Sequence, residues 1–286
     1  MPSLKEVKTR INSVNSTRNI TSAMKMVASS KLHHAQQKIE QMQPYERQLK
    51  EMMATLVGNL EGDFSSPLAQ EREVKRVAIV VFSSNSSLCG GFNGNVIKMT
   101  NRLRESYRGQ QIEVVATYTL GKKAAEALRK ANFEGLQDFS HLLDHPSYGA
   151  IAKIAAAIME DYMAGKIDKV EIIYHHYKSA GTQILMQEQY LPIQINTQQS
   201  ATNHNYLIEP SAATLLQQLV PTSLYLSLFT AMLNSLASEH AARVIAMQVA
   251  TDNADDLLQQ LTLQYNKTRQ QAITAELLDI VGGSMA

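Results

Sequence analysis

Tryptophan is absent from this chain of 286 residues, and aromatic residues make up only 6% of it, whereas methionine occurs 13 times. Aromatic side chains fill thick globular cores, and flexible methionine fills narrow or changing seams. The single cysteine, Cys89, excludes an intrachain disulfide and indicates a reducing compartment. No apolar run approaches the ~20 residues of a membrane span and no signal-peptide core begins the chain, so we expect a soluble protein.

Charge is nearly balanced, with a net charge of +1, which gives no overall sign of a polyanionic partner. The N-terminal region is an exception, because Glu6 is the only acid before Lys38 and seven basic residues accompany it. A basic helix face is usually just solvated. The alternatives that this sequence leaves open are an acidic protein partner or a nucleic acid.

Proline and glycine are both missing from residues 222–281. Apolar residues recur in the C-terminal quarter at helical spacing: Leu219, Leu226, Phe229, Leu233, Leu236, Val244, Met247, Leu258, Leu261, Tyr265, Ile273, Leu277 and Ile280. One helix of about 70 residues would be roughly 105 Å long. Such a helix needs a partner along its side, because most helix stability comes from packing an apolar face.

The N-terminal segment can supply that partner. Ser3 and Glu6 form a possible capping box. An apolar seam follows at spacings of mainly three and four residues: Leu4, Val7, Ile11, Val14, Ile20, Met24, Val27, Leu32, Ala35, Ile39 and Met42. Pro44 predicts a kink or brief break. The seam also includes polar positions, which cost stability but can set the register: Thr17, Thr21, Ser235 and His240.

The middle of the chain alternates strands and helices, which is typical of a small, mostly parallel sheet. The predicted strands are Arg76–Phe82, Ile112–Tyr118, Lys169–Tyr177 and Gln183–Ile193, and the predicted helices are Gly94–Tyr107, Gly121–Ala131 and Ala150–Met163. We therefore predict an α/β fold with a long antiparallel coiled coil. Residues 1–59 and 210–286 are the paired helices, and residues 73–196 form a Rossmann-like domain between them.

No catalytic or metal-binding motif stands out in that domain. The Cys89–Asn95 loop follows the first strand, but it does not match G-x-G-x-x-G and no G-K-[ST] is present. We interpret the loop as a tight structural turn and Cys89 as a small buried residue. His141 and His145 lack the Glu of a metalloprotease motif, and neighbouring histidines point apart. We expect no catalytic residue, no metal site and no cofactor.

Four stretches together carry a resemblance to a known family: residues 20–31, 88–95, 238–243 and 265–283. In this order and over essentially the whole length, the chain resembles the gamma subunit of F-type ATP synthases. The resemblance implies a non-catalytic rotor shaft. It would couple proton or sodium flow through a membrane ring to conformational cycling of the catalytic subunits. The implied partners are the alpha and beta subunits, the epsilon subunit and the c-ring, without nucleic acid or a small-molecule substrate.

The resemblance also implies contact residues. Met24 and Lys25 would face the acidic lever segment of the catalytic subunits, and Arg243 lies in a helix stretch associated with coupling. Further along, Arg269 and Gln270 match positions that hydrogen-bond a catch loop in the ring of catalytic subunits. Thr274 and Glu276 belong to the signature close to the tip. For each residue the plainer alternative is a solvated helix position.

The resemblance also leads to expectations about the C-terminal tip, one loop and the source of the protein. Ile280, Val281 and Gly282 would form an apolar tip that turns in a sleeve of the ring with little friction. Residues 85–87 read Asn-Ser-Ser where the family commonly has Asp-Arg-Gly, and Ser284 replaces a usual Ala. The absence of an inserted cysteine pair and of a transit peptide favours a bacterial protein, peripheral on the cytoplasmic face of the inner membrane.

Two other hypotheses remain open from the residues alone. The first is an α/β nucleotide-binding enzyme with coiled-coil arms, which would bind ATP or NAD in the middle domain. The second is a nucleic-acid-binding coiled coil, which would show a salt-dependent affinity through its basic N-terminal face.

Overall fold

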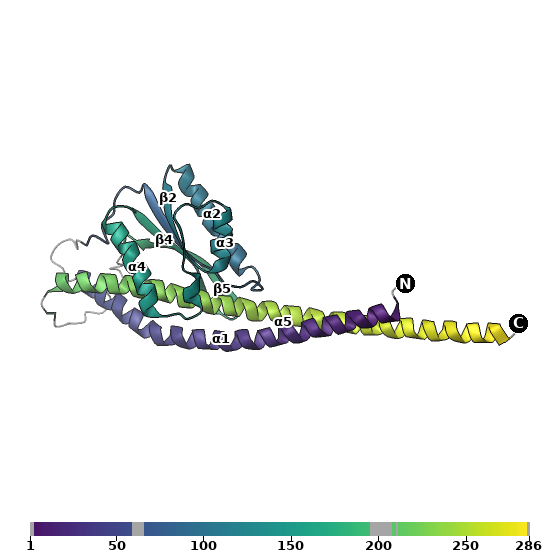
Figure 1. Ribbon diagram of the computed structural model, residues 1–286. Coiled ribbons are helices and arrows are strands. Elements are labelled where there is room, and N and C mark those ends of the chain that lie inside the picture. The colour runs from purple at the N-terminus through teal and green to yellow at the C-terminus, as the bar shows by residue number, and fades with distance from the viewer. Residues whose placement is uncertain (1–2, 59–65, 195–207, 210, 285–286) are drawn as a thin grey trace. The chain divides into compact units, whose positions relative to one another are not determined.

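The computed structural model describes residues 3–58, 66–194, 208–209 and 211–284 (Figure 1). Its elements are α1 (Leu4–Gly58), β1 (Arg76–Phe82), α2 (Phe92–Gly109), β2 (Glu113–Leu120), α3 (Lys122–Lys130), β3 (Leu136–Asp138), a 3-10 turn η1 (Ser140–Leu143), α4 (Tyr148–Met163), β4 (Lys169–Ser179), β5 (Thr182–Leu191) and α5 (Ala212–Ser284). The chain groups into two compact units. We call Met1–Ser29 with Arg243–Ala286 the helix-pair unit and Ser30–Ala242 the sheet unit.

The predicted fold class is confirmed. Five strands form one sheet in the order β3-β2-β1-β4-β5, in which only β5 runs antiparallel to its neighbour. Strand β1 has the predicted bounds. The short β3 and η1 lie in a segment for which no element was predicted. The division into three segments stays a prediction, and its limits at residues 59, 196 and 210 lie outside the described residues.

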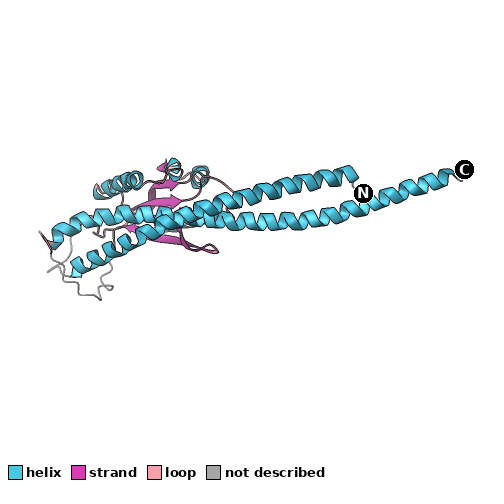
Figure 2. Ribbon diagram, turned by 90° about the horizontal axis from the view of Figure 1, so that it is seen from below, coloured by secondary structure: helices cyan, strands magenta, loops and turns pink. Residues whose placement is uncertain are grey.

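The sheet is buried on both faces because successive strand residues point to opposite sides. Val77, Ile79 and Val81 of β1 pack with residues of α2 and α3. Ala78 and Val80 belong to the larger cluster on the other face, which contains residues of α4, α1 and α5. Both ribbon views agree with this layering inside the sheet unit, with α4 and α5 on one side of the sheet and α2 and α3 on the other (Figures 1 and 2).

Tight turns fix the ends of β1 and β2. Gly121 has φ +130°, and a Cβ there would lie 2.4 Å from the carbonyl oxygen of Ser83. Gly135 has φ +57°, and a Cβ would lie 2.2 Å from the Val115 oxygen. Only glycine avoids both clashes. The Gly121 turn brings the residue after β1 against the start of α3, and the Gly135 turn brings the chain before β3 against β2.

Helix α5 is buried on all sides over one stretch of the sheet unit, where every residue from Ala231 to Glu239 is buried. Tyr190 donates a hydrogen bond of 2.9 Å to the Leu224 carbonyl, and Ser238 donates one of 3.1 Å to the His175 carbonyl. A helix that is apolar all round belongs in a core. Helix α5 also contains a stretch that is long and apolar enough to cross a membrane by length and composition. Most of that stretch is buried inside the protein, as in the core helices of soluble proteins, so it is weak evidence for a span.

The predicted break at Pro44 is wrong, because α1 continues through it from Leu4 to Gly58. A proline removes one backbone hydrogen bond, but the helix around it is held by packing. Ile39, Leu49 and Met53 are all buried in the core of the sheet unit. The predicted N-terminal cap is confirmed, since the Glu6 N–H donates to the Ser3 hydroxyl at 3.2 Å.

Candidate functional site

The helix-pair unit is built on a strict heptad seam. On α1 the positions in step with Val7 are Ile11, Val14, Arg18, Thr21, Lys25 and Ala28, and on α5 those in step with Met247 are Thr251, Ala254, Leu258, Leu261, Tyr265, Thr268 and Ala272. All of them are buried or half-buried. Their spacing of four and three residues matches that of a coiled coil.

Two polar contacts fix the register of this seam. The hydroxyls of Thr21 and Thr251 lie 2.8 Å apart, and Arg18 forms an ion pair of 2.5 Å with Asp255. The residue numbers fall along one helix as they rise along the other. The predicted antiparallel pairing is therefore confirmed.

Two of the predicted seam residues are instead on the outside. Ile20 is 60% exposed and Val27 is 58% exposed, and their neighbour Met26 is 65% exposed. The strict spacing from Val7 places Thr21 and Ala28 in the seam, so Ile20 and Val27 are each one position out of step. Register continuity overrides side-chain hydrophobicity here. A strict count of heptads would have found these outward apolar residues from the sequence.

The outer face of α1 therefore presents apolar side chains beside basic ones. Met24 and Lys25, both predicted contact residues, are half-buried at the edge of the seam. Of the two other polar residues predicted in the seam on this helix, Thr21 is buried and Thr17 is exposed. An exposed apolar patch on a helix usually marks an interaction site.

Beyond Ala272, α5 has no partner helix among the described residues. Figure 1 shows its C-terminal end continuing past the first turns of α1. Residues 273–281 are all exposed, and they include apolar side chains: Ile273, Leu277, Leu278, Ile280 and Val281. Single helices of this kind are marginal in water, so this tip is built for a binding partner.

The remaining predicted contact residues fall into two groups. Arg269, Gln270, Thr274 and Glu276 are exposed on the last turns of α5. The Thr274 hydroxyl donates to the backbone carbonyl of Gln270 at 2.9 Å. Arg243 differs, because it is only 8% exposed and interacts within the chain. The role of each as a partner contact stays a prediction.

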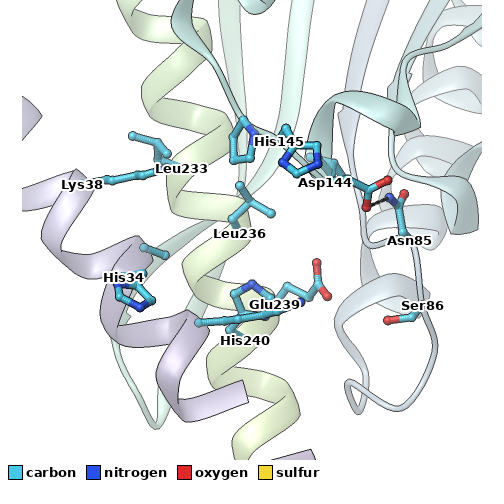
Figure 3. Close-up of a pocket in the computed structure, with 14 residues that line it drawn as sticks. His34, Lys38, Asn85, Ser86, Asp144, His145, Leu233, Leu236, Glu239 and His240 are labelled. Carbon is cyan, nitrogen blue, oxygen red and sulfur yellow. Dashed lines mark hydrogen bonds between the residues drawn. The ribbon is translucent and has the colours of Figure 1, made fainter. Parts of the chain in front are cut away.

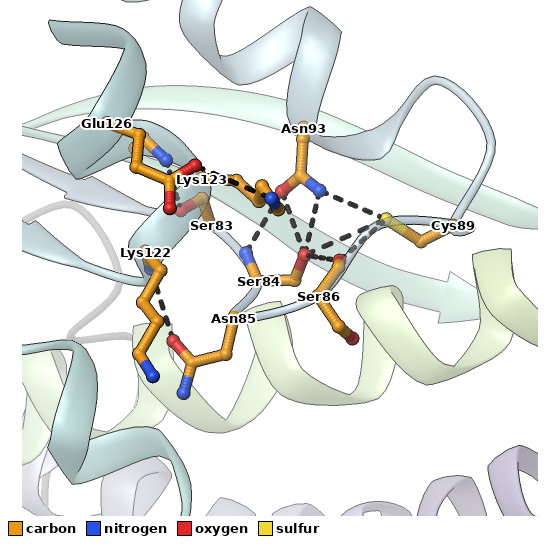
Figure 4. Close-up of polar contacts among 10 residues, drawn as sticks. Ser83, Ser84, Asn85, Ser86, Cys89, Asn93, Lys122, Lys123 and Glu126 are labelled. Carbon is orange, nitrogen blue, oxygen red and sulfur yellow. Dashed lines mark hydrogen bonds and ion pairs between the residues drawn. The ribbon is translucent and has the colours of Figure 1, made fainter.

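The loop after β1 holds itself together rather than forming an open cradle (Figure 4). The Asn93 side chain accepts from the Ser84 N–H at 3.0 Å and donates to the Ser84 hydroxyl and to Cys89 Sγ at 2.7 and 3.2 Å. Cys89 is buried, as predicted. A phosphate site needs free backbone N–H groups at a helix start. In this loop the Ser84 N–H donates to Asn93, and the Phe92 N–H at the start of α2 donates to the Cys89 carbonyl at 3.3 Å.

The start of α3 is likewise occupied. The N–H groups of Lys122 and Ala124 donate to the Asn85 amide oxygen at 3.1 Å and to the Ser83 hydroxyl at 3.0 Å. The Asn85 amide group also donates to the Ser140 carbonyl at 3.1 Å. Asn85 is therefore an internal tie between the loop, α3 and η1.

The carboxyl ends of β1 and β4 mark the topological switch point, where open α/β sheets bind ligands. The ring of Phe92, at the start of α2, stacks on His175 of β4 with centroids 4.4 Å apart. His175 is 4% exposed, and burial lowers its pKa to about 4. This ring pair lies at the switch point. No cluster of three or more metal-binding side chains occurs among the described residues.

The fold thus defines a class of protein: a long antiparallel helix pair with outward apolar residues and an unaccompanied tip, joined to an α/β sheet that has a stacked ring pair, Phe92 and His175, at its switch point. Comparison with known proteins narrows the class. The family model for ATP synthase matches residues 3–286.

Known relatives match at full length. The ATP synthase gamma chain of Bacteroides fragilis strain ATCC 25285 is 55% identical over 291 residues, with 100% of both chains covered. The gamma chain of Flavobacterium johnsoniae is 43% identical over 287 residues, which covers 100% of this chain and 99% of that one. This chain belongs to the ATP synthase gamma chain family.

Solved structures agree on the fold. The rotor of the Euglena gracilis mitochondrial ATP synthase has a TM-score of 0.62 at 18% identity, covering 94% of this chain and 98% of that one. The central stalk and c-ring structure from Tetrahymena thermophila has a TM-score of 0.58 at 23% identity, covering 81% and 99%. At such identities the likeness establishes the architecture alone.

Proposed function

We propose that this chain is the central shaft of a rotary ATP synthase. It couples ion flow through a membrane ring to conformational cycling of catalytic subunits. One observation carries the proposal: gamma chains match this chain over its entire length, including both long helices. Catalysis belongs to the surrounding subunits, and this chain contributes contacts that differ between their states. Only such differential contacts shift a population of conformations.

The geometry supports a shaft in two ways. The helix-pair unit has outward apolar residues on α1, at Ile20, Met26 and Val27. The tip of α5 has its own, at Ile280 and Val281. Apolar contacts are non-directional, so a surrounding sleeve can bind them in many orientations with small barriers between positions.

The proposed partners are the alpha and beta subunits around the helix-pair unit, with the epsilon subunit and the c-ring at the sheet unit. The chain would be a peripheral part of a membrane-bound complex, on the cytoplasmic face of a bacterial inner membrane. Six residues are proposed to contact the ring of alpha and beta subunits: Met24, Lys25, Arg269, Gln270, Thr274 and Glu276. Arg243, which is buried, would act by holding the helix pair together.

The test uses the assembled complex in membrane vesicles. Arg269→Ala removes an exposed guanidinium from the last turns of α5, and a hydrogen bond to a charged group contributes about 1.5–3 kcal/mol. We expect ion-driven ATP synthesis to fall by about tenfold, with unchanged co-purification of the three-fold ring. Arg10→Ala, at an exposed arginine of α1 with no proposed contact, is the matched control. Wild-type synthesis in the Arg269 variant would remove the catch-loop contact.

A separate measurement addresses the shaft itself. The purified chain should hydrolyse no ATP and should bind neither ATP nor NAD in calorimetry. Heat of binding that is abolished by a substitution in the Ser84–Asn93 loop would instead revive the nucleotide-binding enzyme. A salt-dependent affinity for DNA or RNA would support the hypothesis of a nucleic-acid-binding coiled coil.

A further inference from the structure

A cavity of about 570 Å³ lies within the sheet unit, where α1, α5, the loop after β1 and the segment between η1 and α4 meet (Figure 3). Small-molecule sites typically have volumes of about 300–1,000 Å³. None of the contacts proposed for the shaft uses this cavity.

One wall of the cavity is basic. Lys31, His34 and Lys38 lie on one face of α1, at spacings of three and four residues. Neither lysine forms an ion pair or hydrogen bond with another residue in the described part of the chain. By contrast, Lys50 on the same helix is paired with Glu46 at 2.7 Å. His145 approaches from the segment between η1 and α4 (Figure 3).

The two acids at the cavity are already engaged. Asp144 accepts a hydrogen bond of 3.2 Å from the Asn85 amide. Glu239 is only 7% exposed and interacts within the chain. A hydrogen bond does not cancel the charge of a carboxylate, so the lining carries both signs. Lys31 and Lys38 are its charged side chains without a partner in the described part of the chain. Unpaired cationic groups that converge on one space favour an anionic ligand.

The other side of the cavity is apolar, formed by Leu233 and Leu236 of α5 together with Leu143 and Pro146. Ligand sites typically combine such an apolar lining with a few polar groups that fix orientation. We propose that this cavity binds a small amphiphilic anion, with an acidic head group between Lys31 and Lys38 and an apolar body against Leu233 and Leu236. Carboxylate and phosphate head groups share this chemistry.

The test is calorimetry on the full chain, and separately on the assembled complex, with octanoate and with octyl phosphate as probes. The two probes distinguish the head groups. Lys31→Gln with Lys38→Gln should weaken binding by about tenfold or more. Lys5→Gln with Lys8→Gln makes the same charge change elsewhere on α1 and should leave binding unchanged. Binding of neither probe, or equal binding to both double variants, overturns the proposal.

A second measurement does not depend on how the variants fold. In the unsubstituted chain, the ring resonances of His34 and His145 should shift on titration with octanoate. Those of His33, which is on α1 but outside the cavity lining, should not. Equal shifts with inorganic phosphate would remove the apolar half of the proposal, and equal shifts with octanol would remove the anionic half. Unmoved His34 and His145 resonances at saturating probe would overturn the site.

Discussion

The two halves of α5 are both helical, but they differ in how much of their surface is buried. In the sheet unit α5 is enclosed, and consecutive residues from Ala231 to Glu239 are buried. In the helix-pair unit α5 buries only the residues of one narrow seam. Every residue from Ile273 to Val281 is exposed. Helix propensity is similar along its length. What differs is the apolar area that the neighbours cover, which dominates stability.

The sheet unit and the helix-pair unit also differ in the kind of side chain that holds α5 in place. The sheet unit is held by large apolar side chains such as Leu228, Met232 and Phe229. The seam of the helix-pair unit instead includes Arg18, Thr21 and Thr251. Polar seam positions set register at a cost in stability. A shaft needs a firm anchor at one place and an adaptable surface at another, and this difference supplies both.

The largest expected effect tests the anchor. Leu228 is fully buried, so Leu228→Ala should destabilise the sheet unit by about 2–5 kcal/mol. Leu261 lies in the seam, and Leu261→Ala should cost nearer the lower end, about 2 kcal/mol, because the exposed surroundings can relax. Hydrogen exchange measured by mass spectrometry localises each loss. Faster exchange in β1 and β4 is expected for the first variant only.

If Leu261→Ala exposed the strands to exchange as well, the two units would unfold together. The helix pair would then belong to the same cooperative unit as the sheet, and the two regions would not differ in how they unfold.

Acid should weaken the sheet unit specifically, through His175. Burial lowers the pKa of His175 from 6.5 to about 4. Between these values the unfolded chain binds a proton that the folded chain does not, so the stability present above pH 6.5 falls as the pH falls towards 4. The full loss is about 3 kcal/mol. His175→Phe should flatten this slope in urea titrations, whereas His176→Phe, at an exposed neighbour, should leave it.

Asp168 can be separated from this effect. Burial acts to raise the pKa of its carboxyl group, but hydrogen bonds from the Arg76 and Lys75 N–H groups and the Arg76 guanidinium outweigh burial and lower it. Its contribution is present above the ordinary value of 3.8 and is lost below it. A slope between pH 6.5 and 4 that survives in His175→Phe would mean that other groups carry it.

The sequence predicted most of the fold because its patterns were long. The β-branched run of β1 and the helical periodicity of α5 each extend over whole elements, and their bounds were close to those observed. The three residues of β3 are too few to show a pattern. Pro44 misled for a different reason: tertiary packing of Ile39 and Leu49 overrides the local helix-breaking tendency.

The site was harder to predict than the fold. The heptad count from Val7 places Ile20 and Val27 outside the seam, but it does not show that Thr21 pairs with Thr251, 230 positions away. No local pattern contains that pairing. The Phe92–His175 stack at the switch point also joins residues far apart in the sequence. Motif mismatch predicted the absence of a nucleotide loop, but not what occupies its place.

A smaller effect tests whether polar seam residues limit the helix pair. Replacing both Thr21 and Thr251 by Val removes both hydroxyls and keeps the shape, and we expect stability to change by less than about 1 kcal/mol, towards stabilisation. In the complex the same variant should slow ion-driven synthesis only if the seam has to adapt during turnover. Strong destabilisation would show instead that the threonine pair is a main support of the unit.

The smallest effect concerns the ion pairs. Arg18 and Asp255 are 42% and 49% exposed, so a double-mutant cycle should give a coupling of about 0.2–1 kcal/mol in spite of their 2.5 Å contact. Lys50 and Glu46 of the sheet unit form a pair of 2.7 Å and should give about 0.3–0.5 kcal/mol.

Similar couplings in both units, both screened by salt, would leave apolar burial as the difference between them. A markedly larger value for Arg18 and Asp255 would instead mean that charge, more than the apolar seam, holds the helix pair in register.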